Sequence, residues 1–556
     1  MSLEVRYLDI PAGAQAAAMA ESGSSQPFSS AQQAIAGAED VAWASLEPGS
    51  WRLDGSRRLL EDAPRDVFWW SSARSGADGC FEQPPSITIT FPAPYTATGL
   101  SFTFCPAMGQ WCSRLKAAWY NGQTLLSEQY VQPDNATWIL EHTVEYFDRI
   151  ELQFLQTNLP GQFAKLQMLQ IGRARSFGKD ELVRVQLLCE TDPALCELSV
   201  DTMKIEIRDR NARSLLPQEN QKMELYKDGK LIAAQYVQEG YRETRGYYTF
   251  SCRSVIGLLE QTYLGGMYED VPLDTLLGEV LGEHPFQIHR AFSGVTLRGY
   301  LQAQTQRQAL QQIAFAVGAM VTTQGDGIIH LAPLQVNIEG SFTGNRIFSG
   351  AKVKKTAQVG KVELYSHSYV PVDQEECLLD NQVVSGEGVL FVFSQPHHSY
   401  TISGGTIDSS GVNWVRITAA GEVTLLGKKY LHNTSVHTRV NPAATAAEQG
   451  NAVTVEAATL VHAGNVQQAL DRLFTAQKLT GTLTQDAVIS GQRAGQKISS
   501  ENPWGTATEG YITRMDSTFT QSGQTAEVTI RGVEVALKCV FYYAGELFAG
   551  DEEVPY

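Results

Sequence analysis

Apolar and polar residues alternate with period two along most of this chain, as they do in β-strands that bury one face. The first clear stretches are Ser-Ile-Thr-Ile-Thr-Phe at residues 86–91 and Gly-Leu-Ser-Phe-Thr-Phe at residues 99–104. Turn sequences such as Asn121-Gly122 separate the short strands that follow them. Short strands at this spacing, without a long helix, predict an antiparallel sandwich of jelly-roll type over residues 41–173.

The alternation returns in two later parts of the chain. Residues 182–187 and 203–208 alternate, and an Asp228-Gly229 hairpin turn follows them. This segment predicts a small β-barrel, and the Val- and Thr-rich sequence after Gly350 predicts a second group of strands. Residues 1–40 predict an N-terminal strand followed by a loose, Ser- and Gly-rich arm.

Helical periodicity is confined to short segments. After Pro272, an apolar stripe with i, i+3, i+4, i+7, i+8 spacing predicts a helix through Leu273, Leu276, Leu277, Val280 and Leu281. Thr305 as N-cap and Gly318 as the stop predict a second helix, and a third is predicted over residues 465–478. The expected fold is therefore mainly β with accessory helices, in several domains that include a small α+β domain.

Chain length indicates the number of domains, and net charge indicates which partners are disfavoured. A chain of 556 residues exceeds one hydrophobic core and indicates three or four domains. The net charge of −17 disfavours nucleic-acid binding by bulk electrostatics, and no sequence-specific nucleic-acid partner is expected. One basic stretch departs from this balance, and its lysines are interpreted as a solvated strand edge: Lys352, Lys354, Lys355 and Lys361.

Apolar runs, the N-terminal segment and the cysteines indicate the cellular compartment in which the chain folds. No apolar run reaches the length of a membrane-spanning helix, and the N-terminus lacks the apolar region of a secretory signal. The eight cysteines form no C-x-x-C pair and are expected to be free thiols in a reducing compartment. Synthesis and folding are therefore expected in the cytoplasm.

Motifs that carry catalytic chemistry are missing from the sequence. It contains no G-x-S-x-G, H-E-x-x-H or phosphate-binding loop. His397-His398 has no further ligand at metal-binding spacing, and adjacent acids such as Glu61-Asp62, Glu375-Glu376 and Glu552-Glu553 are interpreted as solvated surface. The sequence predicts no catalytic, cofactor-binding or metal-binding residue, and a protein that is not an enzyme.

Aromatic residues are concentrated in the predicted sandwich. Trp111, Trp119, Tyr120 and Trp138 could form a face that stacks on the apolar surfaces of sugars, which makes them the candidate glycan contacts. The alternative is that these rings belong to the core, and the alternating strands around them favour it.

Two groups of motifs resemble known phage proteins. The first comprises Ala-Ser-Leu-Glu-Pro-Gly-Ser-Trp at residues 44–51, Trp-Trp-Ser at 69–71, Trp-Tyr-Asn-Gly at 119–122 and Val-Glu-Tyr-Phe-Asp-Arg-Ile-Glu-Leu at 144–152. These motifs resemble the discoidin-like sandwich in tail proteins of prophages from Firmicute bacteria. The second is the segment at 299–319, with Glu-Gly-Tyr-Ile-Thr-Arg-Met-Asp at 509–516, and it resembles the baseplate-hub and late-control family of phage tail-tip proteins.

The hub resemblance implies a domain plan. It implies two tube-like β-barrel domains, the first at 174–265 and the second, with insertions, at 345–540, and the small α+β domain at 266–344 between them. The discoidin-like sandwich at 41–173 would be an insertion, and residues 541–556 an acidic C-terminal tail. A homotrimer with two tube-like domains per subunit would form a pseudo-sixfold ring that caps a hexameric tail tube.

The implied function is that of a structural hub of a tail tip or baseplate, assembled in the bacterial cytoplasm and carried in the virion. Its partners would be a distal tail or tail-tube protein, a tape-measure protein and a receptor-binding or fibre protein. A negative lumen would allow DNA to pass during genome ejection without sticking. Family members often continue into a C-terminal peptidase, lysozyme or fibre region, and none is expected in this sequence. Two alternatives remain, namely a carbohydrate-binding module that contacts the host cell wall through the discoidin-like domain and an enzyme that cuts peptidoglycan.

Overall fold

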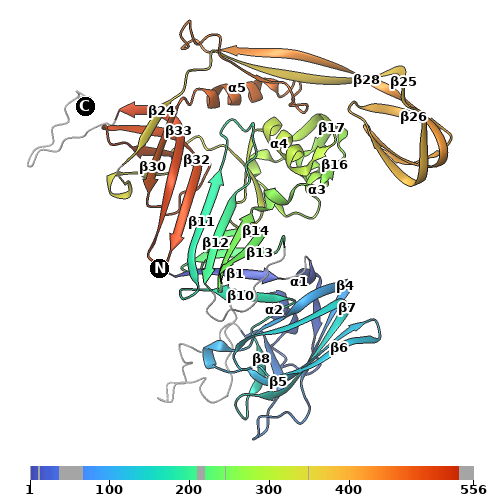
Figure 1. Cartoon of the computed structure of the whole chain (residues 1–556), viewed down its shortest axis with the longest axis vertical. Helices are drawn as coiled ribbons and strands as arrows, with labels where there is room; N and C mark the ends of the chain where they lie inside the picture. The colour runs from blue at the N-terminus through green and yellow to red at the C-terminus, as the bar shows by residue number, and fades with distance from the viewer. Residues whose placement is uncertain are drawn as a thin grey trace, which may run out of the picture. The chain divides into compact units, whose positions relative to one another are not determined.

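The computed structural model describes residues 2–9, 13–36, 67–208, 219–244, 246–348 and 350–536. These residues form two compact units (Figure 1). The sandwich unit comprises Glu4–Phe177 with Leu216–Glu224, and the main unit comprises Met1–Leu3, Gly178–Leu215 and Leu225–Tyr556. The motif at residues 44–51, the acid pairs Glu61-Asp62 and Glu552-Glu553, and the predicted C-terminal tail lie outside the described residues.

The fold is mostly β with short helices, which confirms the predicted class. The described α-helices are α1 (Ala14–Ala17), α2 (Ala31–Ala36), α3 (Leu273–Leu281), α4 (Gln306–Val317) and α5 (Val466–Gln477). Within the described part of the chain, no helix is both long enough and apolar enough to cross a lipid bilayer.

The sandwich unit is built on one antiparallel sheet with the strand order β2-β4-β7-β5-β6, and β9 also pairs with β4. A short β3–β8 pair packs on the same core, and β1 pairs with β10. The strands are β1 (Leu3–Asp9), β2 (Met19–Glu21), β3 (Trp69–Arg74), β4 (Ser86–Thr103), β5 (Cys112–Asn121), β6 (Thr124–Val131), β7 (Thr137–Thr157), β8 (Phe163–Leu166), β9 (Met168–Gln170) and β10 (Arg173–Phe177).

Alternation along β4 explains this core, because Ile87, Ile89 and Phe91 are buried while the threonines between them are partly exposed. The predicted arm also contributes to the sandwich. β2 pairs with β4, and the apolar i, i+3, i+4 set of Ala31, Ala34 and Ile35 on α2 is buried in the same core. Residues 13–36 therefore belong to the domain itself.

The main unit contains a sheet made from two distant parts of the chain. The first part supplies β11 (Leu182–Glu190), β12 (Thr202–Arg208), β14 (Lys230–Thr244) and β15 (Tyr247–Arg253), in the order β14-β15-β12-β11. The second part supplies β24 (Lys352–Lys355), β30 (Gly481–Ala487), β32 (Thr506–Thr520) and β33 (Gly523–Ala536), in the order β32-β33-β30-β24. Pairing of β11 with β32 joins the two parts (Figure 1). Further short strands are β13 (Lys222–Lys227), β23 (Ser341–Phe342) and β31 (Lys497–Glu501).

A small α+β domain lies between these parts in the sequence. The predicted apolar stripe of α3 is confirmed, since its five residues are each at most 2% exposed. α4 begins at the predicted N-cap Thr305 in a capping box with Gln308 and ends at Gly318, whose φ is 78°. The strands are β16 (Thr262–Tyr263), β17 (Gly266–Pro272), β18 (Phe286–Ile288), β19 (Thr296–Leu301), β20 (Gln304–Thr305), β21 (Ala319–Thr322) and β22 (Ile329–Pro333).

Residues 361–455 form a five-stranded sheet in which two strands make a long ribbon. β25 (Lys361–Val392) pairs with β28 (Trp414–Val440), and β29 (Ala452–Val455) extends the ribbon at its base. There α5 covers Val362 and Leu364, while β26 (His397–Ser403) and β27 (Thr406–Ser410) surround a separate core at the tip. A free ribbon of this length has too little core to be stable alone, so these two packing sites support it.

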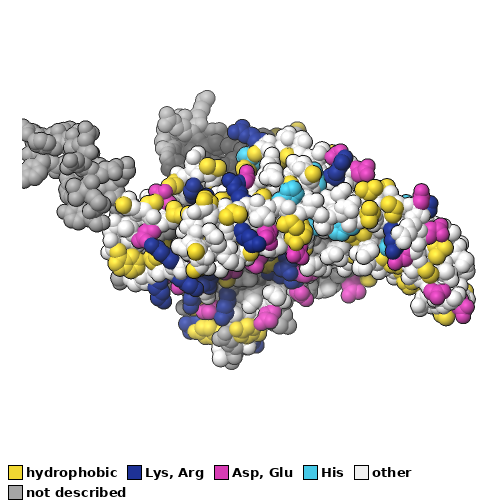
Figure 2. Space-filling view, turned by 90° about the horizontal axis from the view of Figure 1, so that it is seen from above, with side chains coloured by type: hydrophobic (Ala, Val, Ile, Leu, Met, Phe, Trp, Pro, Cys, Tyr) yellow, Lys and Arg dark blue, Asp and Glu magenta, His cyan; other side chains and the backbone are white. Residues whose placement is uncertain are grey.

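Two histidine rings meet at the base of the ribbon. His367 Nδ1 lies 2.9 Å from His432 Nε2, and the His432 ring stacks on Tyr369 at 4.5 Å between centroids. The ring of Tyr300 on β19 makes an edge-to-face contact with Tyr369 at 5.5 Å between centroids. Histidine side chains are visible in cyan in Figure 2, which views the molecule from the side of this ribbon. Burial lowers the pKa of both histidines, and the neighbouring His432 lowers the pKa of His367 further.

We expect this pair to stabilise the ribbon at neutral pH only, by about 1 kcal/mol for its hydrogen bond. Because the folded pKa values lie below the ordinary value of about 6.5, the unfolded chain takes up protons first, and the stabilisation disappears as the pH falls below that value. The melting temperature of His432→Gln should therefore fall less than that of the wild type between about pH 7.5 and about pH 5. Equal falls in the melting temperatures of the variant and the wild type would contradict the prediction. His142→Gln in the sandwich unit is the control, and its melting temperature should fall as much as that of the wild type.

Candidate functional site: the polar sheet face at the β11–β32 joint

The joint between β11 and β32 connects residues more than three hundred positions apart in antiparallel register. Val185 lies opposite Phe519, and Leu187 lies opposite Ser517, on the buried face of the sheet. Successive side chains point to opposite faces of a strand, so the residues between them form the other face. At the joint that face is partly exposed and, apart from Leu188, polar.

A row of directly opposed residues shows how far this polar face extends. Residues opposite one another in a register share a face. The row crosses both parts of the sheet and consists of Glu239, Ser251, Lys204, Gln186, Thr518 and Thr525. Every member of this row is polar, on six strands in succession. The same face also carries one apolar residue at the joint, Leu188, which lies opposite Asp516.

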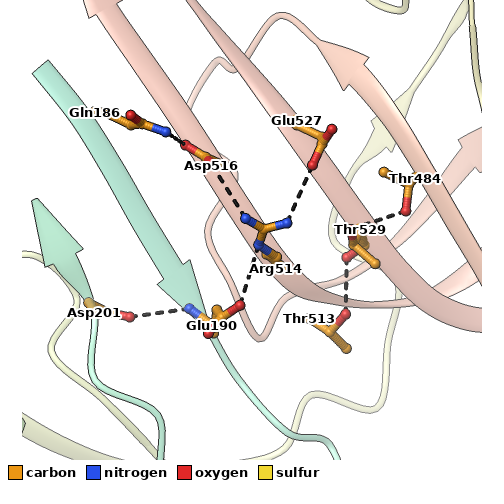
Figure 3. A network of polar contacts seen from close by, with 9 residues as sticks. All are labelled: Gln186, Glu190, Asp201, Thr484, Thr513, Arg514, Asp516, Glu527 and Thr529. Carbon is orange, nitrogen blue, oxygen red and sulfur yellow. Dashed lines mark hydrogen bonds and ion pairs between the residues drawn. The ribbon is translucent and has the colours of Figure 1, made fainter. Parts of the chain in front are cut away.

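Arg514 is the centre of the contacts on this face (Figure 3). Its guanidinium lies 3.4 Å from Glu190 of β11, 3.4 Å from Glu527 of β33 and 3.5 Å from Asp516 of its own strand. The Gln186 side-chain amide donates to Asp516 at 2.8 Å. One arginine therefore links three strands, and the Gln186 bond adds a second connection across the joint.

Neighbouring hydroxyl groups on this face bond to one another or to the backbone. The hydroxyls of Thr484 and Thr529 lie 3.2 Å apart, and the Thr513 hydroxyl donates to the Thr529 carbonyl at 3.3 Å (Figure 3). Basic and acidic side chains are interspersed here, since Arg184, Lys204 and Arg514 share the face with Glu190, Asp516 and Glu527. This arrangement suits a hydrated surface, and the described residues contain no group of three or more His, Cys, Asp or Glu placed to hold a metal ion.

The four aromatic residues predicted from the sequence have different environments. Trp119 is 1% exposed and belongs to the sandwich core, so it is not available to a glycan in this structure. Trp111 and Trp138 are partly exposed and pack against that core, and Trp111 Nε1 donates to the Pro133 carbonyl at 3.0 Å. Tyr120 lies beneath the Arg149 guanidinium at 4.3 Å. Trp111, Tyr120 and Trp138 remain as predicted glycan contacts.

Two other sequence interpretations concern charged segments. β24 ends the sheet at the β30 side, so Lys352, Lys354 and Lys355 do lie on an edge strand. The prediction is wrong for Lys361, which lies on β25 between β28 and β29. His397 is 3% exposed, its Nε2 lies 3.1 Å from Glu376 of β25, and its Nδ1 lies 3.0 Å from the Gln395 carbonyl. This acid partner could not be predicted from the sequence, because the two residues meet only through pairing of β25, β28 and β26.

The contacts of Arg514 were not predicted either. The only available signal was the alternation around it, in which Arg514, Asp516 and Thr518 alternate with Met515, Ser517 and Phe519. That pattern assigns Arg514 to the polar face but does not identify β11 as the neighbouring strand.

Replacing Arg514 with methionine should loosen the joint. The change leaves three carboxylates without their shared cation. Because these side chains are partly exposed, we expect the free energy of unfolding to fall by about 1 kcal/mol. Hydrogen exchange of the β32 amides in a urea titration would measure this decrease in the free energy of unfolding. The decrease should be smaller at about 1 M salt, where exposed charges are screened. Arg184→Met is the matched control, since the Arg184 guanidinium contacts the Thr518 hydroxyl at 3.3 Å. An equal effect of the two substitutions would contradict the role of Arg514.

No protein-family model matches this sequence, and no curated protein is significantly similar to it. Among solved structures, the chain is similar to the 43 kDa tail protein of prophage MuSo2 from Shewanella oneidensis, with TM-score 0.41, 10% identity and coverage of 64% of this chain and 95% of that one. A prophage tail protein from Listeria monocytogenes EGD-e gives TM-score 0.37, 12% identity and coverage of 64% and 90%. The family 32 carbohydrate-binding module of NanJ from C. perfringens, solved with galactose, gives TM-score 0.20 and 14% identity over 31% of this chain and 99% of the module. The structures that this chain is similar to thus include phage tail proteins and, for a smaller part of it, a carbohydrate-binding module.

Proposed function

We propose that this protein is a structural, non-enzymatic hub of a phage tail tip or baseplate, in which three copies form a ring that caps the tail tube. The observation that carries the proposal is the polar row across the β11–β32 joint. Along that row, two separate parts of the chain present polar residues on the same face of one sheet. A water-filled channel needs such a wall, because a strand that contacts solvent on one face alternates polar and apolar residues.

The arrangement of the two parts supports a trimer. Each part contributes a run of antiparallel strands, β14-β15-β12-β11 and β32-β33-β30-β24, placed side by side. Three copies would therefore present six such runs around an axis and could match a sixfold tube. This is the geometry that the sequence resemblance to hub proteins implies, and closed cyclic symmetry is the usual outcome for homo-oligomers.

The charges on this face indicate a channel wall of mixed charge, where a negative wall was expected from the sequence. Both signs are present near the joint, where Arg514 is surrounded by Glu190, Asp516 and Glu527. We propose that passing DNA meets a mixed, hydrated wall on which the arginine is already paired with protein carboxylates. Few free cations then remain to hold phosphate groups.

Ring closure requires the end of the sheet to meet a neighbouring copy. β24 is the end strand on the second side, and its lysines would face a chain whose net charge is −17. Partners at the two ends of the ring would be a tail-tube or distal tail protein, a tape-measure protein and a receptor-binding or fibre protein, in a virion assembled in the bacterial cytoplasm. Glycan binding by the sandwich unit through Trp111, Tyr120 and Trp138 is the second proposed function.

Light scattering of the purified full chain should give three times the 61.0 kDa chain mass.

Lys354→Glu should raise the dissociation constant of the trimer by about tenfold, because it places an acid against a negative neighbour. Lys179→Glu, on an exposed turn, changes the net charge equally and should leave the trimer intact. A chain that stays monomeric at every concentration would contradict the ring, and equal effects of the two substitutions would contradict closure through β24.

A further inference from the structure

The polar face of the main-unit sheet ends at two different strands. At one end, β24 pairs only with β30. At the other end, β14 has fifteen residues and β13 has six, and the hairpin turn between them pairs β13 with the first half of β14. Residues 236–244 therefore extend past β13, and no other described strand pairs with their outer edge. In a ring of identical copies, one of these ends meets the other.

A bulge on β14 determines which side chains lie at that end of the face. The register with β15 shifts between Val237 and Glu239, which leaves Gln238 as an extra residue. Because of this shift, Glu239 and Tyr241 point to the polar face, whereas strict alternation from the buried Val237 would turn them inward. Both side chains are exposed, Tyr241 by 45%. The polar face therefore ends here in an acid and an aromatic ring.

The β24 end carries a lysine and an aromatic ring on the same face. Lys352 lies opposite Thr484, whose hydroxyl is on the polar face. Ile347 forms a bridge to the buried Ala487, so the next residue, Phe348, points to the polar face and is 45% exposed. Aromatic residues are enriched in the surfaces that proteins bury against one another, and each end of this face presents one.

The lysines of β24 and the acid of β14 carry opposite charges that are not compensated within the chain. Lys355 is paired with Glu534 at 2.9 Å. Among the residues that the structure describes, Lys352 and Lys354 form no ion pair at their end of the face, and neither does Glu239 at the other end. Opposite charges of this kind steer two surfaces together and fix how they meet.

Other described charges near the two ends do not cancel this complementarity. Asp486 lies on β30, one strand inside the β24 end. Arg242 lies opposite the buried Tyr248 and points to the other face, with its guanidinium 5.9 Å from the centre of that ring. The outermost described charges on the polar face are therefore the two free lysines on β24 and Glu239 on β14.

The charged residue and the aromatic ring follow one another in the same order at both ends. The cross-strand registers connect each of these four residues to one position on β11. In order along β11, these positions are 190 for Lys352, 188 for Phe348, 186 for Glu239 and 184 for Tyr241. A stagger of four residues between neighbouring copies, about 13 Å, therefore brings each lysine to an acid and each phenylalanine to a tyrosine. Closing a sheet into a barrel requires a stagger.

We propose that β24 and residues 346–348 of one copy contact residues 239–241 of the next copy through their side chains, with Lys352 against Glu239 and Phe348 against Tyr241. This contact rests on the proposed ring and names the two surfaces that close it. The occupant of each end is a second copy of this chain, because both complementary surfaces belong to one sheet face. The lysines and the bulge discourage regular backbone pairing with an unrelated strand.

A charge exchange in the full chain tests the contact. Glu239→Lys and Lys352→Glu should each raise the dissociation constant of the trimer by about tenfold, and the double variant should return it to within about twofold of the wild type. Sedimentation over a concentration series measures these constants. Glu206→Lys is the matched control, because Glu206 lies on the same face but on the interior strand β12. It should leave the trimer unchanged and should not rescue Lys352→Glu.

Cross-linking gives a second measurement that does not depend on charge. A chain carrying both Tyr241→Cys and Phe348→Cys, treated with a short bis-maleimide, should give denatured bands at two and three chain masses. Each single variant is a control and should give neither band. A trimer that shows no charge rescue and no such bands would overturn this contact while leaving the ring intact. A chain that is monomeric at every concentration would overturn the ring and the contact together.

Discussion

Backbone pairing between β11 and β32 is the interaction on which the main unit depends. It joins segments more than three hundred residues apart, and the polar row proposed to line the channel crosses this joint. Loop closure over so long a separation costs conformational entropy that the pairing must offset. Apolar contacts such as Val185 with Phe519 on one face, and the contacts of Arg514 on the other, supply the compensation. The buried core and the polar wall are therefore two consequences of one register.

The alternation of side chains along β32 separates these consequences. Arg514, Asp516 and Thr518 point to the hydrated face, and Met515, Ser517 and Phe519 point to the buried one. A shift of register by one residue would exchange the two sets and place Arg514 in the core. The same strand can therefore contribute to an assembly surface and to the core without mixing their chemistry.

Local features were predictable from the sequence because their causes lie within a few residues. The apolar stripe of α3, the capping box at Thr305 and the Gly318 stop were all identified in this way. The pairing of β11 with β32 was not, because period-two alternation specifies which side of a strand is buried but not which strand lies beside it. The Arg514 contacts and the approach of Glu376 to His397 both depend on such distant pairing. The sandwich aromatics show the same limit, since Trp119 is core and Tyr120, next to it, lies partly exposed beneath Arg149.

The most direct test of the hub proposal is an electron cryomicroscopy map of the purified full chain. It should show a threefold ring in which the row from Glu239 to Thr525 faces a central channel and the β11–β32 joint is repeated around it. A ring whose channel is lined by other residues, or particles that contain one copy of the chain, would contradict the account.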